Sequence, residues 1–129
     1  MEHANSFKEL VVYQKSRTLA QSIFKITKAF PKEEMYSLTD QIRRSSRSIG
    51  AQIAEAWGKR RYEKHFISKL SDADAEQLET QHWIIIAQDC EYLTHKQFET
   101  LNQNLLEIGR MLYSMMKKAN QFCSVTTDH

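Results

Sequence analysis

Residues 94–122 read THKQFETLNQNLLEIGRMLYSMMKKANQF, and this stretch decides the fold. Its apolar residues recur at alternating spacings of three and four, the period of a helix that buries one seam. Thr94 and Gln97 can form a capping box at the start, because each side chain can satisfy a free backbone donor there. We predict a helix over about residues 94–122 and a polar tail over 123–129. The seam consists of Phe98, Leu101, Leu105, Ile108, Leu112, Met115, Ala119 and Phe122.

Three earlier segments carry helical apolar patterns of the same kind. The first runs over about residues 6–29 and ends before Pro31, because the residue preceding a proline is held out of the helical region. The second spans about residues 37–57 and stops near Gly58, and the third spans about 62–92 with a polar middle. Short connections favour antiparallel neighbours. The predicted fold class is all-α, an up-down-up-down antiparallel four-helix bundle that occupies residues 1–129 as a single domain.

Composition supports this prediction and suggests a compartment. Three Gly and one Pro in 129 residues are too few for a turn-rich β fold. No apolar run approaches the roughly 20 residues that cross a bilayer, so we expect no membrane span. The chain begins without the basic and apolar segments of a signal peptide. Cys90 and Cys123 form no motif, and we interpret them as free thiols of a reducing cytosol rather than a bridge. We therefore expect a cytoplasmic protein.

Patterns for catalysis or metal binding are weak. Glu79 and His82 have the E-x-x-H spacing of di-iron bundles, but such sites need two of these motifs and two further glutamates. Neither cysteine has a His partner at a recognisable spacing, and no G-x-S-x-G elbow or glycine-rich phosphate loop occurs. We predict a non-enzymatic protein with no catalytic residue, no metal site and no cofactor, and a metalloenzyme remains a distant alternative.

Charge is distributed unevenly along the chain. Residues 40–64 carry seven cations and three carboxylates, a net of +4, whereas residues 71–107 carry one cation and eight carboxylates, a net of −7. Such asymmetry marks either a polyanion-binding face or two helices that pair with each other. In a hairpin that turns near residue 61, Arg47 would lie opposite Glu76 and Arg44 opposite Glu79. We predict that these four residues form structural ion pairs.

The turn of that hairpin is the main candidate site. It concentrates cations, has only Glu63 nearby, and places Trp57 and Tyr62 among them as stacking surfaces. Such a cluster indicates either a nucleic-acid-binding surface or an ordinary solvated turn. The candidate nucleic-acid-binding residues are Lys59, Arg60, Arg61, Lys64 and Arg43.

Two further features suggest assembly. A mid-helix Gly costs about 1 kcal/mol relative to Ala, so Gly50 indicates a close neighbour in the same bundle or in another subunit. The last helix also has more apolar surface than one bundle face requires, and we expect a homo-oligomer. The additional apolar residues are Leu106, Met111, Tyr113 and Met116.

Several motifs occur together in a recognisable order. VYQK spans residues 12–15, FPKEE 30–34 and LTDQIRR 38–44; SI follows at 48–49, IAE at 53–55 and EQLETQ at 76–81. Over about residues 6–120 the chain resembles the bacterial four-helix-bundle proteins first noticed in the intervening sequences of 23S ribosomal RNA genes. Where that family usually has Asn-Ile-Ala-Glu-Gly, this chain has QIAEA at residues 52–56.

The resemblance implies a ring-like homopentamer, similar to the accessory protein of diversity-generating retroelements, which is basic and works with a reverse transcriptase and nucleic acid. The expected partners are further copies of this chain, with RNA or a nucleic-acid enzyme as an additional partner. The leading hypothesis is a homo-oligomeric, nucleic-acid-binding accessory bundle. The alternative is a scaffold that recruits a protein and binds no nucleic acid.

Overall fold

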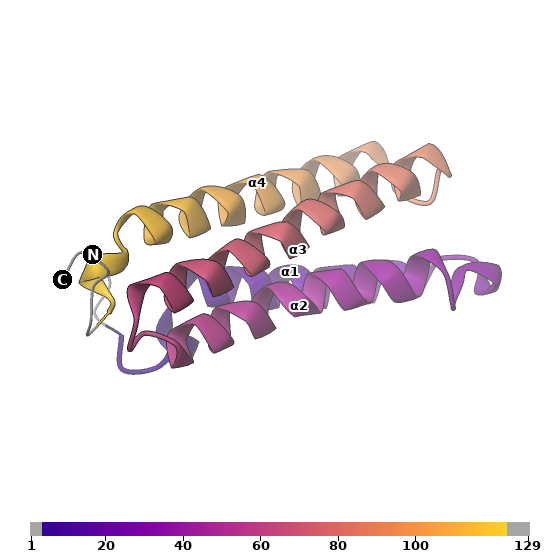
Figure 1. The fold of residues 1–129 in the computed structure, drawn as a ribbon. Helices are drawn as coiled ribbons and strands as arrows, with labels where there is room; N and C mark the ends of the chain where they lie inside the picture. Colours follow the sequence, from indigo (N-terminus) through magenta and orange to yellow (C-terminus); the bar gives the residue numbers. More distant parts are fainter. Residues whose placement is uncertain (1–3, 124–129) are drawn as a thin grey trace.

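Each predicted helix has a counterpart in the computed structural model, which describes residues 4–123. Figure 1 shows the four long helices running antiparallel, with α1 and α2 in one layer and α3 and α4 in the other. No strand occurs between residues 4 and 123. The predicted all-α, up-down-up-down four-helix bundle is confirmed. The α-helices are α1 (Val11–Thr27), α2 (Leu38–Gly58), α3 (Glu63–Asp89) and α4 (His95–Lys117), and the 3-10 helices are η1 (Phe7–Glu9), η2 (Lys32–Glu34) and η3 (Ala119–Gln121).

The helix ends differ from the prediction at three places. Ser6 caps η1 rather than α1, and Leu10, with φ −66° and ψ 131°, is extended and buried between the two. The first helix was therefore predicted to begin too early. The predicted last helix is α4 and η3 separated by Lys118, and residues 124–129 of the predicted tail lie outside the described chain. The third helix ends at Asp89 instead of residue 92.

Backbone geometry explains where α3 ends. Glu91 has φ 61°, in the left-handed region. Its N–H donates to the Gln88 carbonyl at 2.9 Å, and the Tyr92 N–H donates to the Ala87 carbonyl at 2.9 Å. These two bonds form a Schellman motif, which normally has glycine at the left-handed position. Because glutamate stands there, the sequence gives no stop signal. By contrast α2 ends at Gly58 as predicted, although no glycine has a positive φ.

All four helices contribute to one core. The predicted α4 seam is buried at its centre from Leu101 to Met115, and Phe98 and Phe122 at its ends are half-buried. On α3 the buried side chains recur every three or four residues through the polar middle, so Gln77 and Thr80 lie inside. The buried residues of α3 are Phe66, Leu70, Ala73, Gln77, Thr80, Ile84 and Ala87.

The buried side chains of Gln77 and Thr80 in the middle of α3 are hydrogen-bonded within α3 and to α2. Thr80 Oγ1 lies 2.8 Å from Ser45 Oγ of α2. The Gln77 amide donates to Asp74 Oδ1 at 2.9 Å and accepts from Gln81 Nε2 at 2.7 Å. A Cβ on Gly109 of α4 would lie 2.9 Å from Gln77 Nε2, so this glycine leaves room for the Gln77 side chain between α3 and α4.

Gly50 has its close neighbour within the same bundle. A Cβ there would meet Ser16 Oγ at 3.3 Å and the Tyr13 ring at 3.4 Å, both on α1.

A hydrogen bond links the α1–α2 connection to the α3–α4 connection. The Tyr92 hydroxyl donates to Glu34 Oε2 at 2.9 Å. This carboxylate raises the pKa of Tyr92 to about 12.

Candidate nucleic-acid interface

The connection between α2 and α3 and the first turn of α3, residues 59–64, form the tip of the hairpin. Lys59 caps α2 with φ −99° and ψ 13°, and α3 begins at Glu63. Arg60 folds back on α2: its Nε donates to the Trp57 carbonyl at 2.8 Å, and its guanidinium carbon lies 3.5 Å from the Trp57 ring centroid. The guanidinium is therefore held flat against an indole by a cation–π contact.

The remaining tip cations are exposed. The Arg61 Nε donates to the Tyr62 hydroxyl at 3.2 Å, and Tyr62 is 44% exposed with its ring edge-on to His65. Lys59 and Lys64 make no ion pair with any residue between 4 and 123. The tip thus presents exposed ammonium groups beside guanidinium–aromatic pairs, a combination suited to phosphates and unstacked bases.

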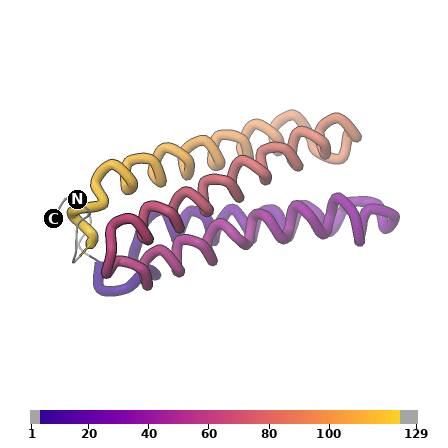
Figure 2. Tube along the Cα trace, viewed as in Figure 1, coloured from indigo at the N-terminus to yellow at the C-terminus, as the bar shows by residue number. Residues whose placement is uncertain are grey.

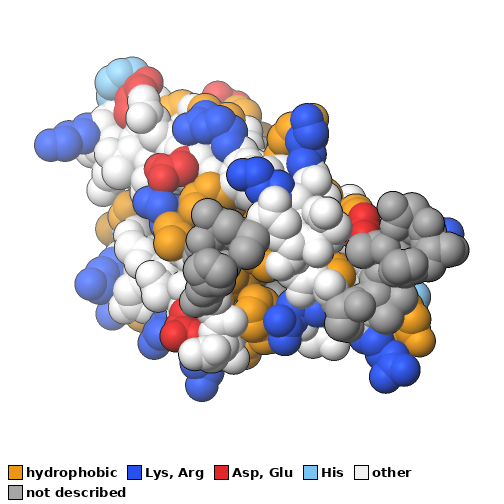
Figure 3. All heavy atoms as spheres, turned by 90° about the vertical axis from the view of Figure 1, so that its left-hand side faces the viewer, with side chains coloured by type: hydrophobic (Ala, Val, Ile, Leu, Met, Phe, Trp, Pro, Cys, Tyr) orange, Lys and Arg blue, Asp and Glu red, His pale blue; other side chains and the backbone are white. Residues whose placement is uncertain are grey.

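Topology adds cations from other elements to the tip. The chain enters through η1 and leaves through η3 at the same end as the α2–α3 connection (Figure 2). We call residues 7–9, 59–64 and 117–121 the basic end; it holds seven cations against Glu9 and Glu63. Figure 3 looks at this end and shows Lys and Arg side chains spread around it. The cations missed by sequence reasoning are Lys8, Lys117 and Lys118.

The opposite end of the bundle has the opposite charge. Residues 28–40 and 89–99 carry three cations and six carboxylates, a net of −3. Cations near the C-terminal ends of α2 and α4 also complement the helix dipoles, which accounts for part of their placement. Helix dipoles do not explain Lys8 or Lys64, which lie near the N-terminal ends of α1 and α3.

Arg43 does not belong to this surface. It lies 16 residues before Lys59, which is about 24 Å along a helix that rises roughly 1.5 Å per residue. Its Nε donates to Thr27 Oγ1 at 2.8 Å, and its guanidinium carbon lies 4.8 Å from the Phe24 ring centroid. The structure therefore does not bring Arg43 together with the tip residues, because α2 carries it to the other half of the bundle, and nucleic-acid binding by Arg43 stays a prediction.

Of the predicted ion pairs, the structure contains the one between Arg44 and Glu79. Arg44 also lies 3.6 Å from Glu76, and Trp83 Nε1 donates to Glu79 Oε2 at 2.9 Å. The hydrogen bonds from Trp83 and Arg44 lower the pKa of Glu79, and the hydrogen bond to Glu79 raises the pKa of Arg44.

Arg47 takes a different partner from the one predicted. Its guanidinium carbon lies 5.4 Å from the Phe24 ring centroid on α1, and the prediction of a pair with Glu76 is wrong. The hairpin register treats α2 and α3 as an isolated pair. It therefore omits the aromatic ring that α1 presents to the other side of α2.

The described residues offer little for catalysis. Between residues 4 and 123 no group of three or more His, Cys, Asp or Glu side chains could hold a metal ion. Glu79 of the E-x-x-H spacing is engaged by Arg44, and the His82 ring lies edge-on to Trp83. Burial raises the pKa of the Cys123 thiol, and Glu63 raises it further. A thiol of this kind stays protonated and is a poor nucleophile.

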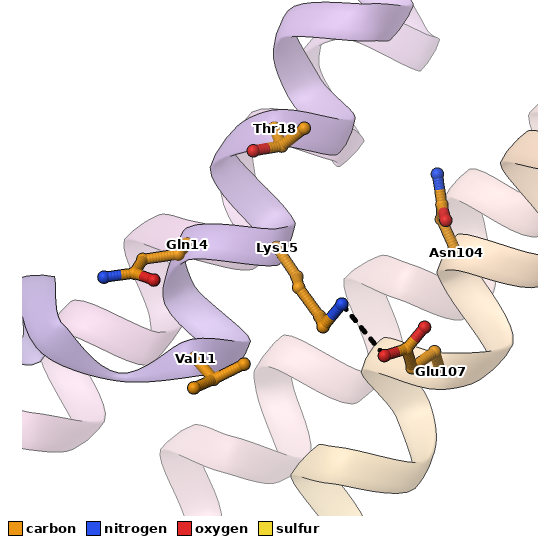
Figure 4. A pocket seen from close by; sticks show the side chains of 6 residues that line it. All are labelled: Val11, Gln14, Lys15, Thr18, Asn104 and Glu107. Atoms are coloured by element: carbon orange, nitrogen blue, oxygen red, sulfur yellow. Dashed lines mark ion pairs between the residues drawn. The ribbon is translucent and has the colours of Figure 1, made fainter.

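A shallow pocket lies between α1 and α4. Its volume is about 310 Å³, and a 2.9 Å ion pair between Lys15 and Glu107 crosses it (Figure 4). The pair neutralises the two charged groups that line the pocket, so the pocket has no unbalanced charge with which to bind an ion. It is lined by Val11, Gln14, Lys15, Thr18, Asn104 and Glu107.

No helix in the described part of the chain is long and apolar enough to cross a membrane.

Comparison with known proteins identifies the family. No curated protein matches the chain. Among solved structures it is similar to a crystal structure of a protein with unknown function from the S23 ribosomal protein family from Bacteroides thetaiotaomicron, with 36% identity and a TM-score of 0.75. The match covers 83% of this chain and 96% of that one. A family model described as 23S rRNA-intervening sequence protein matches residues 8–114, and the chain therefore belongs to that family.

Proposed function

We propose that this protein is a non-enzymatic, homo-oligomeric bundle that binds RNA through its basic end. The observation that carries the proposal is the gathering of seven cations from η1, the tip and the end of α4, against two carboxylates. The opposite end has a net charge of −3, so an RNA chain is attracted to one end only.

Assembly is part of the proposal, because one basic end offers few phosphate contacts. Each contact releases counterions, and several linked ends bind one RNA with higher avidity. Exposed apolar side chains on α3 and α4 support self-association, and the resemblance to the accessory protein of diversity-generating retroelements favours a pentamer. The same resemblance suggests an accessory role beside a nucleic-acid enzyme such as a reverse transcriptase. Both cysteines are free, which suits a cytoplasmic protein.

Charge reversal at the tip tests RNA binding. The variant Lys59→Glu/Lys64→Glu changes two exposed lysines that make no ion pair with residues 4–123, and it leaves the Trp57–Arg60 contact in place. We expect gel-shift affinity for structured RNA to fall at least tenfold at low salt.

The matched control is Lys32→Glu/Lys96→Glu, which makes the same change in net charge at the opposite end. It should weaken RNA binding far less than the tip variant. If both variants lose the same amount of RNA affinity, binding depends on the net charge of the protein and not on the tip. If the wild type binds no RNA at low salt, the proposal of RNA binding is refuted.

A protein-recruiting scaffold is the second candidate. Tyr36 is 94% exposed and the adjacent Met35 is 44% exposed, which is unusual for an aromatic and an apolar side chain on a protein without a partner. The overall net charge of only +2 also favours this alternative. If RNA binding fails while the chain still assembles, the scaffold becomes the leading function.

A further inference from the structure

Helix α3 carries a second seam, largely apolar, that faces away from the core. Ala75, Leu78 and Ile85 lie on it with His82 between the last two, at spacings of three and four, and all are exposed. Leu78 is 53% exposed and Ile85 is 48% exposed. A regular three–four spacing is what a second helix requires of its partner. The core of this bundle already occupies the opposite side of α3, so the outer seam is available for another molecule.

Helix α4 extends this seam. Leu106 is 43% exposed and Tyr113 is 60% exposed, seven residues apart on one side of the helix. Gly109 of α4 packs against Gln77 of α3. Leu78 and Leu106 both lie within one turn of that crossing, so the two helices present one apolar strip. We call Ala75, Leu78, His82, Ile85, Leu106 and Tyr113 the outer strip.

The outer side of α2 bears a hollow of about 550 Å³. Its wall includes Arg43 and Arg47, which lie over the Phe24 ring and make no ion pair with a carboxylate in residues 4–123. Thr39 Oγ1 on the wall is buried without a hydrogen-bond partner. Small residues, Ser48 and Ala51, leave room for an approaching side chain. We call this hollow the α2 groove; it is lined by Met35, Tyr36, Thr39, Asp40, Arg43, Arg44, Arg47, Ser48 and Ala51.

The outer strip and the α2 groove lie at the same level along the bundle. Arg44 in the groove pairs with Glu79, the residue next to Leu78 in the strip. A rotation about an axis parallel to the helices therefore brings the strip of one copy toward the groove of the next. Their charges are complementary: α3 and α4, which carry the strip, together have a net charge of −3, whereas α1 and α2 together have a net charge of +4.

We propose that the outer strip of one copy of this chain packs into the α2 groove of the next copy. This inference rests on the proposed homo-oligomer and names the two surfaces that form it. Strip and groove differ in shape and charge, so the contact is heterologous, and repetition of a heterologous contact closes a ring when its rotation permits. Packing strip against strip would instead oppose the two acidic α3 helices.

Two point variants, each blocking one surface, test the pairing. Leu78→Glu adds a charge to the strip, and Ala51→Arg adds bulk and a like charge to the groove; both positions are exposed, so the fold should survive. Circular dichroism checks the fold, and light scattering after size exclusion measures the mass. Each variant alone should fall from the wild-type mass to that of one chain, 15.2 kDa. An equimolar mixture should give a two-chain species, because one intact strip then meets one intact groove.

Controls and contrary outcomes separate this inference from the proposed function. Gln21→Glu and Gln21→Arg place the same residues on the exposed side of α1 and should leave the wild-type mass unchanged. If Ala51→Arg assembles like the wild type, the groove is not the interface although the protein is still oligomeric. A mixture that contains only single chains also refutes the pairing. A wild type that is itself a single chain refutes both the pairing and the proposed oligomer.

Discussion

Arg44 forms an ion pair between α2 and α3. It contacts Glu79 and lies 3.6 Å from Glu76, and its side chain is 46% exposed. Solvent screening limits what such a pair contributes, and we expect Glu79→Gln to lower the free energy of unfolding at neutral pH by about 1 kcal/mol. Glutamine can still accept the hydrogen bond from Trp83, so the change isolates the carboxylate charge.

The contribution of Glu79 should depend on pH in one direction. Its pKa in the folded protein is lowered from 4.5, so the stabilisation is complete above that value and is lost as pH falls through the lowered pKa. Urea unfolding of wild type and Glu79→Gln at neutral and acidic pH measures the difference. It should shrink in acid, whereas Glu33→Gln, at an exposed carboxylate, should stay near the wild type throughout. A difference that is independent of pH would exclude the charge as its cause.

Single residues also show the limit of sequence reasoning. The pairing of Arg44 with Glu79 could be predicted because both lie on one hairpin, whose register follows from its turn. The position of Arg47 could not, since Phe24 belongs to a helix outside that hairpin. Gln77 lies buried against Gly109 for a similar reason: the polar middle of α3 reads as solvent-exposed until α4 is placed beside it.

At the level of the elements, apolar period predicted the four helices well and their ends less well. The spacing of apolar residues shows which side of a helix is buried. The same spacing continues through a break in the helix, such as Leu10 or the step from α4 to η3, and so does not reveal the break. Ends depend on backbone angles. Thr94 and Gln97 form the predicted capping box because they have the side chains that this geometry uses. The Schellman end of α3 has glutamate where glycine is usual and was therefore missed.

The end of α3 gives a prediction about stability. A left-handed conformation costs a residue with a side chain roughly 1–2 kcal/mol, and glycine adopts it freely although it loses more entropy on folding. We expect Glu91→Gly to raise the free energy of unfolding by about 0.5–1 kcal/mol. Thermal and urea unfolding provide the measurement. Glu91→Ala is the matched control, because it removes the same charge and keeps the backbone cost. If alanine stabilises as much as glycine, the gain comes from removing a carboxylate near a helix C-terminus.

Over the whole molecule, positive and negative charges are concentrated at opposite ends of the bundle, although the net charge is small. The net charge is +2, yet one end of the bundle has seven cations against two carboxylates and the other has a net of −3. Four of the seven cations are consecutive or nearly so, and the sequence alone identified them. Lys8, Lys117 and Lys118 are distant in sequence, and only the antiparallel path of α1 and α4 brings them to the tip.

The two proposals together determine how the basic ends are arranged. A ring formed about an axis parallel to the bundle places every basic end on the same face, whereas a two-fold dimer with its axis across the helices would separate them. One basic end has seven cations. Each phosphate contact adds roughly 0.7 to 0.9 to the slope of log affinity against log salt, so one basic end accounts for a slope of at most about 6. A ring should exceed this value with long RNA.

Binding by the assembly should therefore depend on RNA length, and the dependence should vanish in the groove variant. Ala51→Arg leaves the tip unchanged but is expected to hold the protein as single chains. Filter binding at several salt concentrations should show that the wild type prefers long RNA to a short oligonucleotide by at least tenfold, with the steeper salt slope on the long RNA. Ala51→Arg should bind both lengths with similar, weak affinity and a slope no steeper than that of one basic end. If Ala51→Arg is a single chain and still prefers long RNA as strongly as the wild type, the basic ends do not act together, and RNA binding does not depend on the ring.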